Sequence, residues 1–219
     1  MGGRTMFLRA TRIQASPDKV DAAIENFKAS TVKTLRSAPG NQGAVLLVDR
    51  RSGAALGVTY WESVKALASS EQTGMEARTQ TATSAGARIV NVERAELMIM
   101  DRAAAPKAGT FMRLVTANGD PEKLDAAIVY IRNQVLPILK AQHGYQATVA
   151  SVDRQTGRLS VSTVWETSED EAASASKLAG PRAEAAKIAG AGPHDVQVEV
   201  FETAVVDISA AVTQAQARA

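Results

Sequence analysis

Two arginines, Arg9 and Arg113, stand 104 residues apart, each within a stretch whose pattern predicts a β-strand. A charge in the middle of a strand is costly unless it is paired. A guanidinium there could hold an oxyanion, such as a phenolate, a carboxylate or a reduced-dioxygen intermediate, through charge-assisted hydrogen bonds. The structural alternative is an ion pair with the last strand of the same half, through Glu93 or Glu96 for Arg9 and Glu199 or Glu202 for Arg113.

Three further polar side chains are candidates for chemistry. His143 precedes a glycine at a predicted helix end, where the helix dipole favours its charged form. As a functional group it would accept a proton near neutral pH. Tyr60 and Tyr145 lie near the predicted sheet edge. The matching positions of the other half hold different residues: Pro39 matches His143, Val164 matches Tyr60, and Asn41 matches Tyr145. If the two halves differ in function, these three side chains therefore contribute to the difference.

The composition excludes several kinds of site. The chain has no cysteine, which rules out disulfides, thiolate catalysis and Cys-ligated metal centres. Its two histidines, His143 and His194, are too few for a three- or four-histidine metal site within one chain. We therefore predict no metal site.

The charge and hydropathy of the chain indicate which partners to expect. The net charge is +2, and the basic residues are scattered among acids, so we predict no nucleic-acid partner. No apolar run approaches the roughly 20 residues that span a bilayer, and the N-terminus lacks the apolar core of a secretory signal. We predict a cytoplasmic protein with no membrane partner.

The sequence repeats itself. Residues 7–62 align with residues 111–166 at an offset of 104 without a gap, and both copies contain the tetrapeptide "DAAI". Near the end the offset becomes 106, because two residues are added in the last helical region of the second copy. The predicted organisation is a first unit at 5–101, a linker at 102–110, a second unit at 111–207 and a tail at 208–219.

Each copy predicts the same order of elements. Ser16 and Pro17 are typical of a helix start, and the apolar residues from Val20 to Leu35 follow helical spacing. The other predicted elements of the first copy are a strand at 5–14, a hairpin at 44–62 turning at Asp49–Gly53, a helix at 63–86 broken near Thr73–Gly74, and a closing strand at 87–101. The order β-α-β-β-α-β is the ferredoxin-like pattern.

An antiparallel sheet that is covered by helices on one side leaves its other face to be buried. Leu46, Leu47 and Val48 are consecutive apolar residues, as expected for a strand covered on both faces. The predicted fold class is α+β, with two fused ferredoxin-like units forming one dimeric-type α/β barrel. The chain would then be a monomeric pseudo-dimer or a homodimer of it.

With its helix ending in "PG" or "HG" and its strand ending in "WES" or "WET", the chain resembles the antibiotic-biosynthesis-monooxygenase-like domains of the dimeric α/β-barrel superfamily. The matching stretches run from Pro39–Gly40 to Ser63 and from His143–Gly144 to Thr167. The resemblance implies a pocket between sheet and helices in each unit. It also implies that Trp61 and Trp165 form the wall against a flat aromatic ligand, although each could equally be a core side chain.

The resemblance also implies a choice of chemistry. Some members of the superfamily oxidise polycyclic phenols with dioxygen and no cofactor, and others bind and degrade haem. The haem degraders place a histidine nine or ten residues after the tryptophan, where this chain has Ser70, Glu71, Ser174 and Ala175. We therefore predict no haem and no other cofactor.

The leading hypothesis is a cofactor-independent monooxygenase-like protein that acts on or binds a flat aromatic or phenolic small molecule in a barrel pocket. The predicted catalytic residues are Arg9, Arg113 and His143, and the predicted substrate-binding residues are Trp61, Trp165, Tyr60 and Tyr145. The alternative is a non-catalytic small-molecule-binding or assembly protein that uses the repeated unit as a scaffold. An open pocket touching Trp and Arg favours the first hypothesis, and filled lumens with each Arg locked to Glu favour the second.

Overall fold

The computed structural model describes residues 5–209, so residues 210–219 of the predicted tail lie outside it. By compactness the described chain divides into two units. The first comprises residues 5–94, 106–108 and 201–209, and the second comprises residues 95–105 and 109–200. Within these ranges no helix combines the length and the apolar character needed to cross a bilayer.

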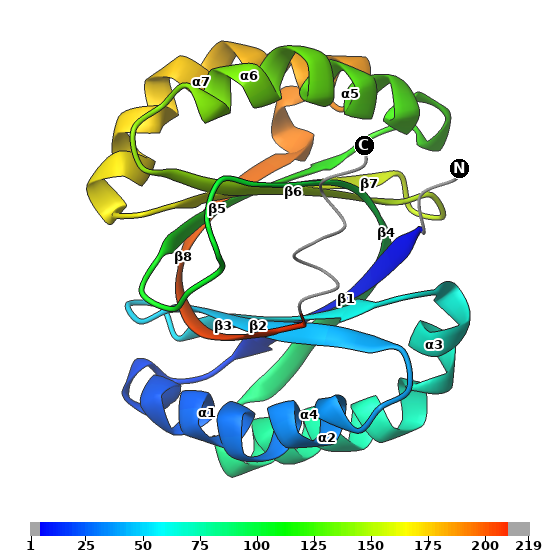
Figure 1. The fold of residues 1–219 in the computed structure, drawn as a ribbon, viewed down its shortest axis with the longest axis vertical. Coiled ribbons are helices and arrows are strands. Elements are labelled where there is room, and N and C mark those ends of the chain that lie inside the picture. Colours follow the sequence, from blue (N-terminus) through cyan, green and yellow to red (C-terminus); the bar gives the residue numbers. More distant parts are fainter. Residues whose placement is uncertain (1–4, 210–219) are drawn as a thin grey trace. The chain divides into compact units, whose positions relative to one another are not determined.

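The first unit is an antiparallel sheet with helices on one face (Figure 1). Its strands, in hydrogen-bonded order, are β1 (Met6–Gln14), β3 (Ala54–Trp61), β2 (Asn41–Asp49) and the second part of β8 (Val196–Ile208). Its helices are α1 (Val20–Asn26), α2 (Lys33–Arg36), α3 (Val64–Ser69) and α4 (Glu71–Ser84), and a short 3-10 turn, Pro17–Lys19, precedes α1. The first residues of β4 (Arg88–Arg102) also belong to this unit.

The second unit has the same order of elements. Its strands are β5 (Phe111–Asn118), β7 (Arg158–Trp165), β6 (Tyr145–Asp153) and the second part of β4. Its helices are α5 (Leu124–Tyr130), α6 (Leu136–Lys140) and α7 (Ser168–Ile188), with 3-10 turns at Pro121–Lys123 and Pro193–Asp195. The predicted fold class, α+β with two fused ferredoxin-like units, is confirmed.

The closing strand of each copy completes the sheet of the other copy. In the first unit β2 pairs with β8, with Val45 opposite Val206. In the second unit β6 pairs with β4, with Val149 opposite Met100. Each closing strand is therefore long, because its first part lies in one unit and its second part in the other.

The local signals in the sequence correspond to specific backbone features. Gly53 closes the β2–β3 turn with a φ of +76°, a conformation that side chains other than glycine rarely adopt. The expected break near Thr73–Gly74 is wrong, since the helix is interrupted at Ser70, between α3 and α4. Ser63 caps α3 by accepting a hydrogen bond from the amide of Ala66, which fixes where this helix begins.

A π-helical turn continues the first long helix of each unit, at Phe27–Val32 and Ile131–Val135. Such turns are uncommon and often occur at functional sites, because the extra residue changes which side chains face inward. In the first unit the turn supplies three buried side chains, Phe27, Thr31 and Val32. Each unit has its own apolar core between helices and sheet, centred on Trp61 in the first and Trp165 in the second.

Candidate functional site

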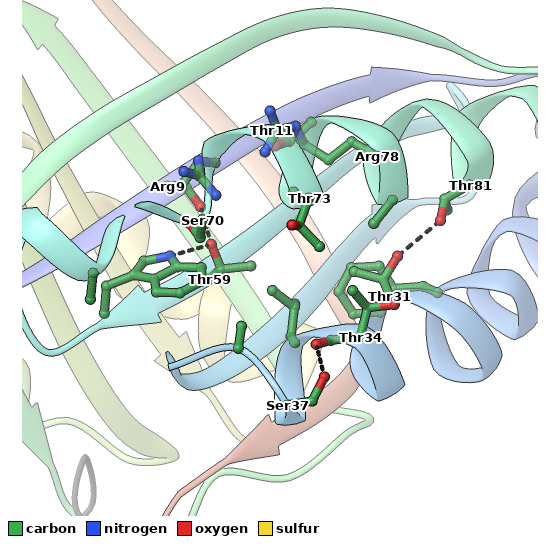
Figure 2. Close-up of a pocket in the computed structure, with 18 of the residues that line it drawn as sticks. Arg9, Thr11, Thr31, Thr34, Ser37, Thr59, Ser70, Thr73, Arg78 and Thr81 are labelled. Atoms are coloured by element: carbon green, nitrogen blue, oxygen red, sulfur yellow. Dashed lines mark hydrogen bonds between the residues drawn. The ribbon is translucent and has the colours of Figure 1, made fainter. Parts of the chain in front are cut away.

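The first unit contains a cavity of about 340 Å³, which lies between strands β1 and β3 and the helices that cover this face of the sheet. Side chains of β1 at alternate positions, Arg9, Thr11 and Ile13, line its floor, as the two-residue period of a strand requires. Figure 2 shows Arg9, Thr11 and Arg78 along one side of the cavity and Thr31, Thr34 and Ser37 on the other. The cavity is thus built from two strands and four helical segments of one unit.

Arg9 lies at one end of the cavity and is 2% exposed. Its Nη2 donates to the carbonyl oxygen of Leu67 at 2.7 Å and to Glu71 Oε2 at 2.9 Å. The centre of its guanidinium lies 5.5 Å from the ring centroid of Trp61, within the range of a cation–π contact. Its Nε is buried and has no hydrogen-bond partner. Arg9 and Trp61, both predicted site residues, therefore do meet at one cavity.

Glu71 is the shared counter-ion of the arginines at this end of the cavity. Besides Arg9, it binds Arg78 at 2.8 Å and Arg94 at 2.7 Å. Desolvation raises the pKa of Glu71, but the hydrogen bond from Arg94 and the charge of Arg9 outweigh it and lower the pKa to about 2. The pKa of Arg9 is also lowered, mainly by burial, although Glu71 opposes this change. Three guanidiniums thus surround one carboxylate.

The predicted ion-pair partners of the two arginines are wrong. The structure places Glu71 of α4 against Arg9, whereas the expected partner was Glu93 or Glu96 of the closing strand. The exchange of closing strands removes Glu96, which lies in the second unit and there binds Arg154 at 3.1 Å. Glu93 lies in the first unit, but Arg9 pairs with the helix carboxylate Glu71 instead. Glu202 lies in the first unit and binds Arg50 at 2.8 Å.

Both hydroxyl-bearing and apolar side chains line the rest of the cavity. Trp61 is fully buried, and its Nε1 donates to Thr59 Oγ1 at 2.9 Å, which fixes the indole plane at the cavity wall. At the far end the hydroxyls of Thr31 and Thr81 share a hydrogen bond of 2.9 Å (Figure 2). The exposed lining residues, which mark the mouth, lie at the end of α2 and at the α3–α4 junction: Ser37, Pro39, Ser69 and Thr73.

The second unit offers an internal comparison, because its hydrogen bonds show which residues correspond. Ser70 and Ser174 each donate to the carbonyl three residues earlier, at 2.8 and 2.6 Å. Those carbonyls belong to Leu67 and Glu171, and each also accepts from the strand arginine of its unit. The offset of 104 therefore holds through the helices, and the two added residues lie just beyond α7.

The corresponding cavity of the second unit is almost filled, at about 60 Å³. Leu178 stands where the first unit has Gly74, and Val161 stands where it has Gly57. Three threonines of the first cavity are also replaced by apolar residues, since Thr11, Thr31 and Thr81 correspond to Val115, Val135 and Ala185. Side-chain volume thus closes this site, and its remaining wall is mostly apolar, with Arg113, Thr163 and Arg182 as its polar members.

Arg113 is buried in the second unit and fully engaged there. It forms an ion pair with Glu171, and it donates to Ser174 Oγ at 2.9 Å and to the carbonyl of Glu171 at 2.7 Å. The predicted partners, Glu199 or Glu202, are again replaced by a helix carboxylate. Glu171 corresponds to Leu67 in the first unit, whereas Glu71 corresponds to Ala175, so the counter-ion has moved by one helical turn between the units.

The structure does not bring the predicted tyrosines into either cavity. Tyr60 is buried on the face of β3 opposite to Thr59 and Trp61. Tyr145 donates to Asp101 Oδ1 at 3.0 Å, and its ring packs edge-on against Trp165 with centroids 6.0 Å apart. Burial raises the pKa of Tyr145, so its hydroxyl stays protonated. Trp165 is fully buried in the core of its unit and does not line the small cavity.

His143 lies at the surface, with its side chain 95% exposed. Its Nδ1 is 2.6 Å from Asp170 Oδ1, and this hydrogen bond raises the pKa of His143. The residue lines neither cavity, so the geometry gives it no part in a reaction there. Among the described residues no cluster of His, Asp and Glu side chains is arranged to hold a metal ion.

Sequence reasoning missed two residues of the site, Glu71 and Arg78. They are seven residues apart, which places them on one face of α4, and this spacing is the signal that could have found them. The third missed residue is Glu171, at the corresponding helix of the second unit. It follows Glu169 and Asp170 in the first turn of α7, where acidic residues are favoured in any helix, so its residue type gave no comparable signal.

Comparison with known families adds to this geometry. Residues 6–82 match the family model described as antibiotic biosynthesis monooxygenase. This stretch of the chain is therefore similar to the antibiotic biosynthesis monooxygenase family. The matched segment runs from β1 through most of α4 and contains every residue that lines the open cavity.

Relatives extend the similarity beyond this segment. Two uncharacterized proteins of Mycobacterium tuberculosis (strain H37Rv) are 28% identical to the chain. One matches over 156 residues, covering 71% of this chain and 69% of the relative, and the other over 161 residues, covering 73% and 67%. Both alignments are longer than the antibiotic biosynthesis monooxygenase segment.

Solved structures share the fold. A protein from Fusobacterium nucleatum superposes with a TM-score of 0.68 at 15% identity, covering 93% of this chain and 94% of its own. An anthrone oxidase-like protein also gives 0.68, at 13% identity and 91% coverage of both chains. A monooxygenase-like protein from Listeria innocua gives 0.53 at 8% identity, with coverage of 90% and 94%. At these identities the likeness establishes the fold.

Proposed function

We propose that the first unit binds a flat, electron-rich aromatic molecule in its cavity and that the protein oxidises this molecule with dioxygen, without a cofactor. The observation that carries the proposal is the open cavity of about 340 Å³ in which Trp61 and the buried Arg9 meet. This volume lies in the range of roughly 300–1,000 Å³ typical of small-molecule sites. The match of residues 6–82 to the antibiotic biosynthesis monooxygenase family supports it.

The side chains of the cavity suit a reaction through an anion. The aromatic ring would lie against Trp61, with its oxygen towards Arg9. A guanidinium in a desolvated site favours the phenolate or enolate over the neutral molecule, and this electron-rich form is the one that reacts with dioxygen. At a ring-activated methylene, one molecule of dioxygen converts the methylene into a carbonyl and releases one molecule of water. One oxygen atom becomes the carbonyl and the other leaves with both methylene hydrogens, so no external reductant is needed.

A second candidate is binding without catalysis. The residues lining the open cavity include no Asp, Glu, His, Lys or Tyr that could act as a general base. Ionisation of a substrate would therefore depend on the cationic environment and on water. The predicted assembly role needs both a filled cavity and an arginine paired with a glutamate. The second unit meets both conditions, whereas the first unit has the Arg9–Glu71 pair but an open cavity.

The experiment that tests the proposal uses anthrone, which has a ring-activated methylene, as the probe under ¹⁸O₂. We expect oxygen uptake, one ¹⁸O atom in the carbonyl formed, and a large loss of rate in Arg9→Met. Binding of anthrone without oxygen uptake would favour the second candidate. If anthrone and similar polycyclic phenols neither bind nor react, the proposal fails.

A further inference from the structure

The end of the cavity beside Arg9 carries more positive than negative charge. Arg9 and Arg78 both line it, and the carboxylate they share, Glu71, also binds Arg94. The residues lining the cavity include no acidic side chain. One carboxylate cannot neutralise three guanidiniums, so the site has an excess of positive charge that an anionic ligand would balance.

Two of these guanidiniums also have hydrogen-bond donors that are not used. The Nε atoms of Arg9 and Arg78 are both buried and have no hydrogen-bond partner. Arg9 is 2% exposed, and the side chain of Arg78 is 11% exposed. A buried donor without a partner is costly, and an acceptor on a ligand would remove that cost. The unused donors and the excess charge therefore point to the same kind of ligand.

The two guanidiniums also converge on one point. A Cβ atom built on Gly74 would lie 2.9 Å from Nη1 of Arg9 and 2.9 Å from Nη1 of Arg78. The absence of a side chain at Gly74 therefore leaves room between two cationic groups. In the second unit this position is Leu178, and Arg113 there has a carboxylate partner that is itself buried. The first unit alone keeps the space and the uncompensated charge together.

We propose that the cavity of the first unit selects an aromatic ligand that carries an oxyanion, and that Arg78, together with Arg9, binds this oxyanion beside Gly74. Arg78 is thus a specificity-determining residue that distinguishes a carboxylate or phenolate from its neutral analogue. This inference rests on the proposed binding of a flat aromatic molecule. It adds that the molecule is negatively charged and that Arg78 recognises this charge.

The test compares 2-naphthoate with 2-naphthamide, which has the same rings and nearly the same shape but no charge. Binding is measured by calorimetry to the full chain, for the wild type, Arg78→Met and Arg78→Lys. Arg182→Met is the matched control, because Arg182 holds the corresponding position in the nearly filled cavity of the second unit. Adding 2-naphthol above its own pKa tells whether a phenolate is accepted as well as a carboxylate.

We expect the wild type to bind 2-naphthoate at least about tenfold more tightly than 2-naphthamide, as one charge-assisted hydrogen bond would give. Arg78→Met should lower this ratio several-fold with little change for the amide, because only Arg9 then binds the oxyanion, whereas Arg78→Lys should keep more of the ratio and Arg182→Met should keep all of it. A ratio near one in the wild type, or a ratio that is unchanged in Arg78→Met, overturns the inference and leaves aromatic binding intact. If neither compound binds, the proposed function fails, and the inference fails with it.

Discussion

Gly74→Leu places in the first unit the side chain that fills the corresponding site of the second. A Cβ atom at Gly74 meets the Nη1 atoms of Arg9 and Arg78 at 2.9 Å, so both guanidiniums must move. Both atoms are the ends of flexible side chains, so this movement is possible without a shift of the backbone. The leucine then occupies the space beside Trp61 that a ligand would use. We expect binding of 2-naphthoate and of anthrone to weaken by more than about tenfold.

The same substitution is expected to stabilise the fold. Replacing glycine within α4 by leucine favours the helix by about 0.8 kcal/mol. Burying the leucine side chain contributes a further ~1.5–3 kcal/mol. Disturbing the hydrogen bonds of the two arginines opposes this by about 1–2 kcal/mol. The free energy of unfolding should therefore rise by about 0.3–2.8 kcal/mol, which at this chain length raises Tm by up to roughly 11 °C.

The assay is thermal and urea unfolding together with calorimetric binding, measured on the same preparations. Gly180→Leu is the control, because Gly180 is an exposed residue of α7 with no heavy atom near its Cβ position. It should change helix propensity alone and leave binding untouched. Undiminished binding in Gly74→Leu would show that the cavity is not the binding site. Destabilisation by several kcal/mol would show that Gly74 is required for packing, contrary to this reasoning.

Three further predictions follow from the charges. Glu171→Gln leaves the buried Arg113 without its counter-ion and should lower the free energy of unfolding by about 3–5 kcal/mol in urea. The pKa of Glu71 is lowered to about 2, so its stabilisation is complete above the unfolded value of 4.5 and is lost as the pH falls towards 2; a Glu71→Gln variant should lose less stability over this range than the wild type. His143 has a raised pKa, so its small contribution to the stability of the fold is present below pH 6.5 and is lost as the pH rises. His143→Gln should leave ligand binding unchanged at every pH, and a binding defect in this variant would place the residue in the site after all.

Local sequence signals predicted the order of the elements correctly. Helical spacing from Val20 to Leu35, a glycine able to adopt positive φ at position 53 and apolar strands on either side of it are short-range properties. They act within a few residues, so a single sequence shows them. The position of the helix break was wrong because Gly74 is a weak helix former that was expected to interrupt the helix. The structure keeps it within α4, where it leaves room for two guanidiniums.

The sequence by itself also determined that Arg9 and Arg113 need partners, because a charge within a strand is costly in any fold. Only the tertiary structure decided which partners they have, since Arg9 and Glu71 are 62 residues apart and the exchange of closing strands places Glu96 and Glu202 in the other unit from their expected arginine. Tertiary packing likewise decided that one cavity is open and the other nearly filled. Within an isolated helix a glycine and a leucine differ only by about 0.8 kcal/mol of helix propensity. Their difference in volume opens or closes a cavity only where that face of the helix packs against a sheet.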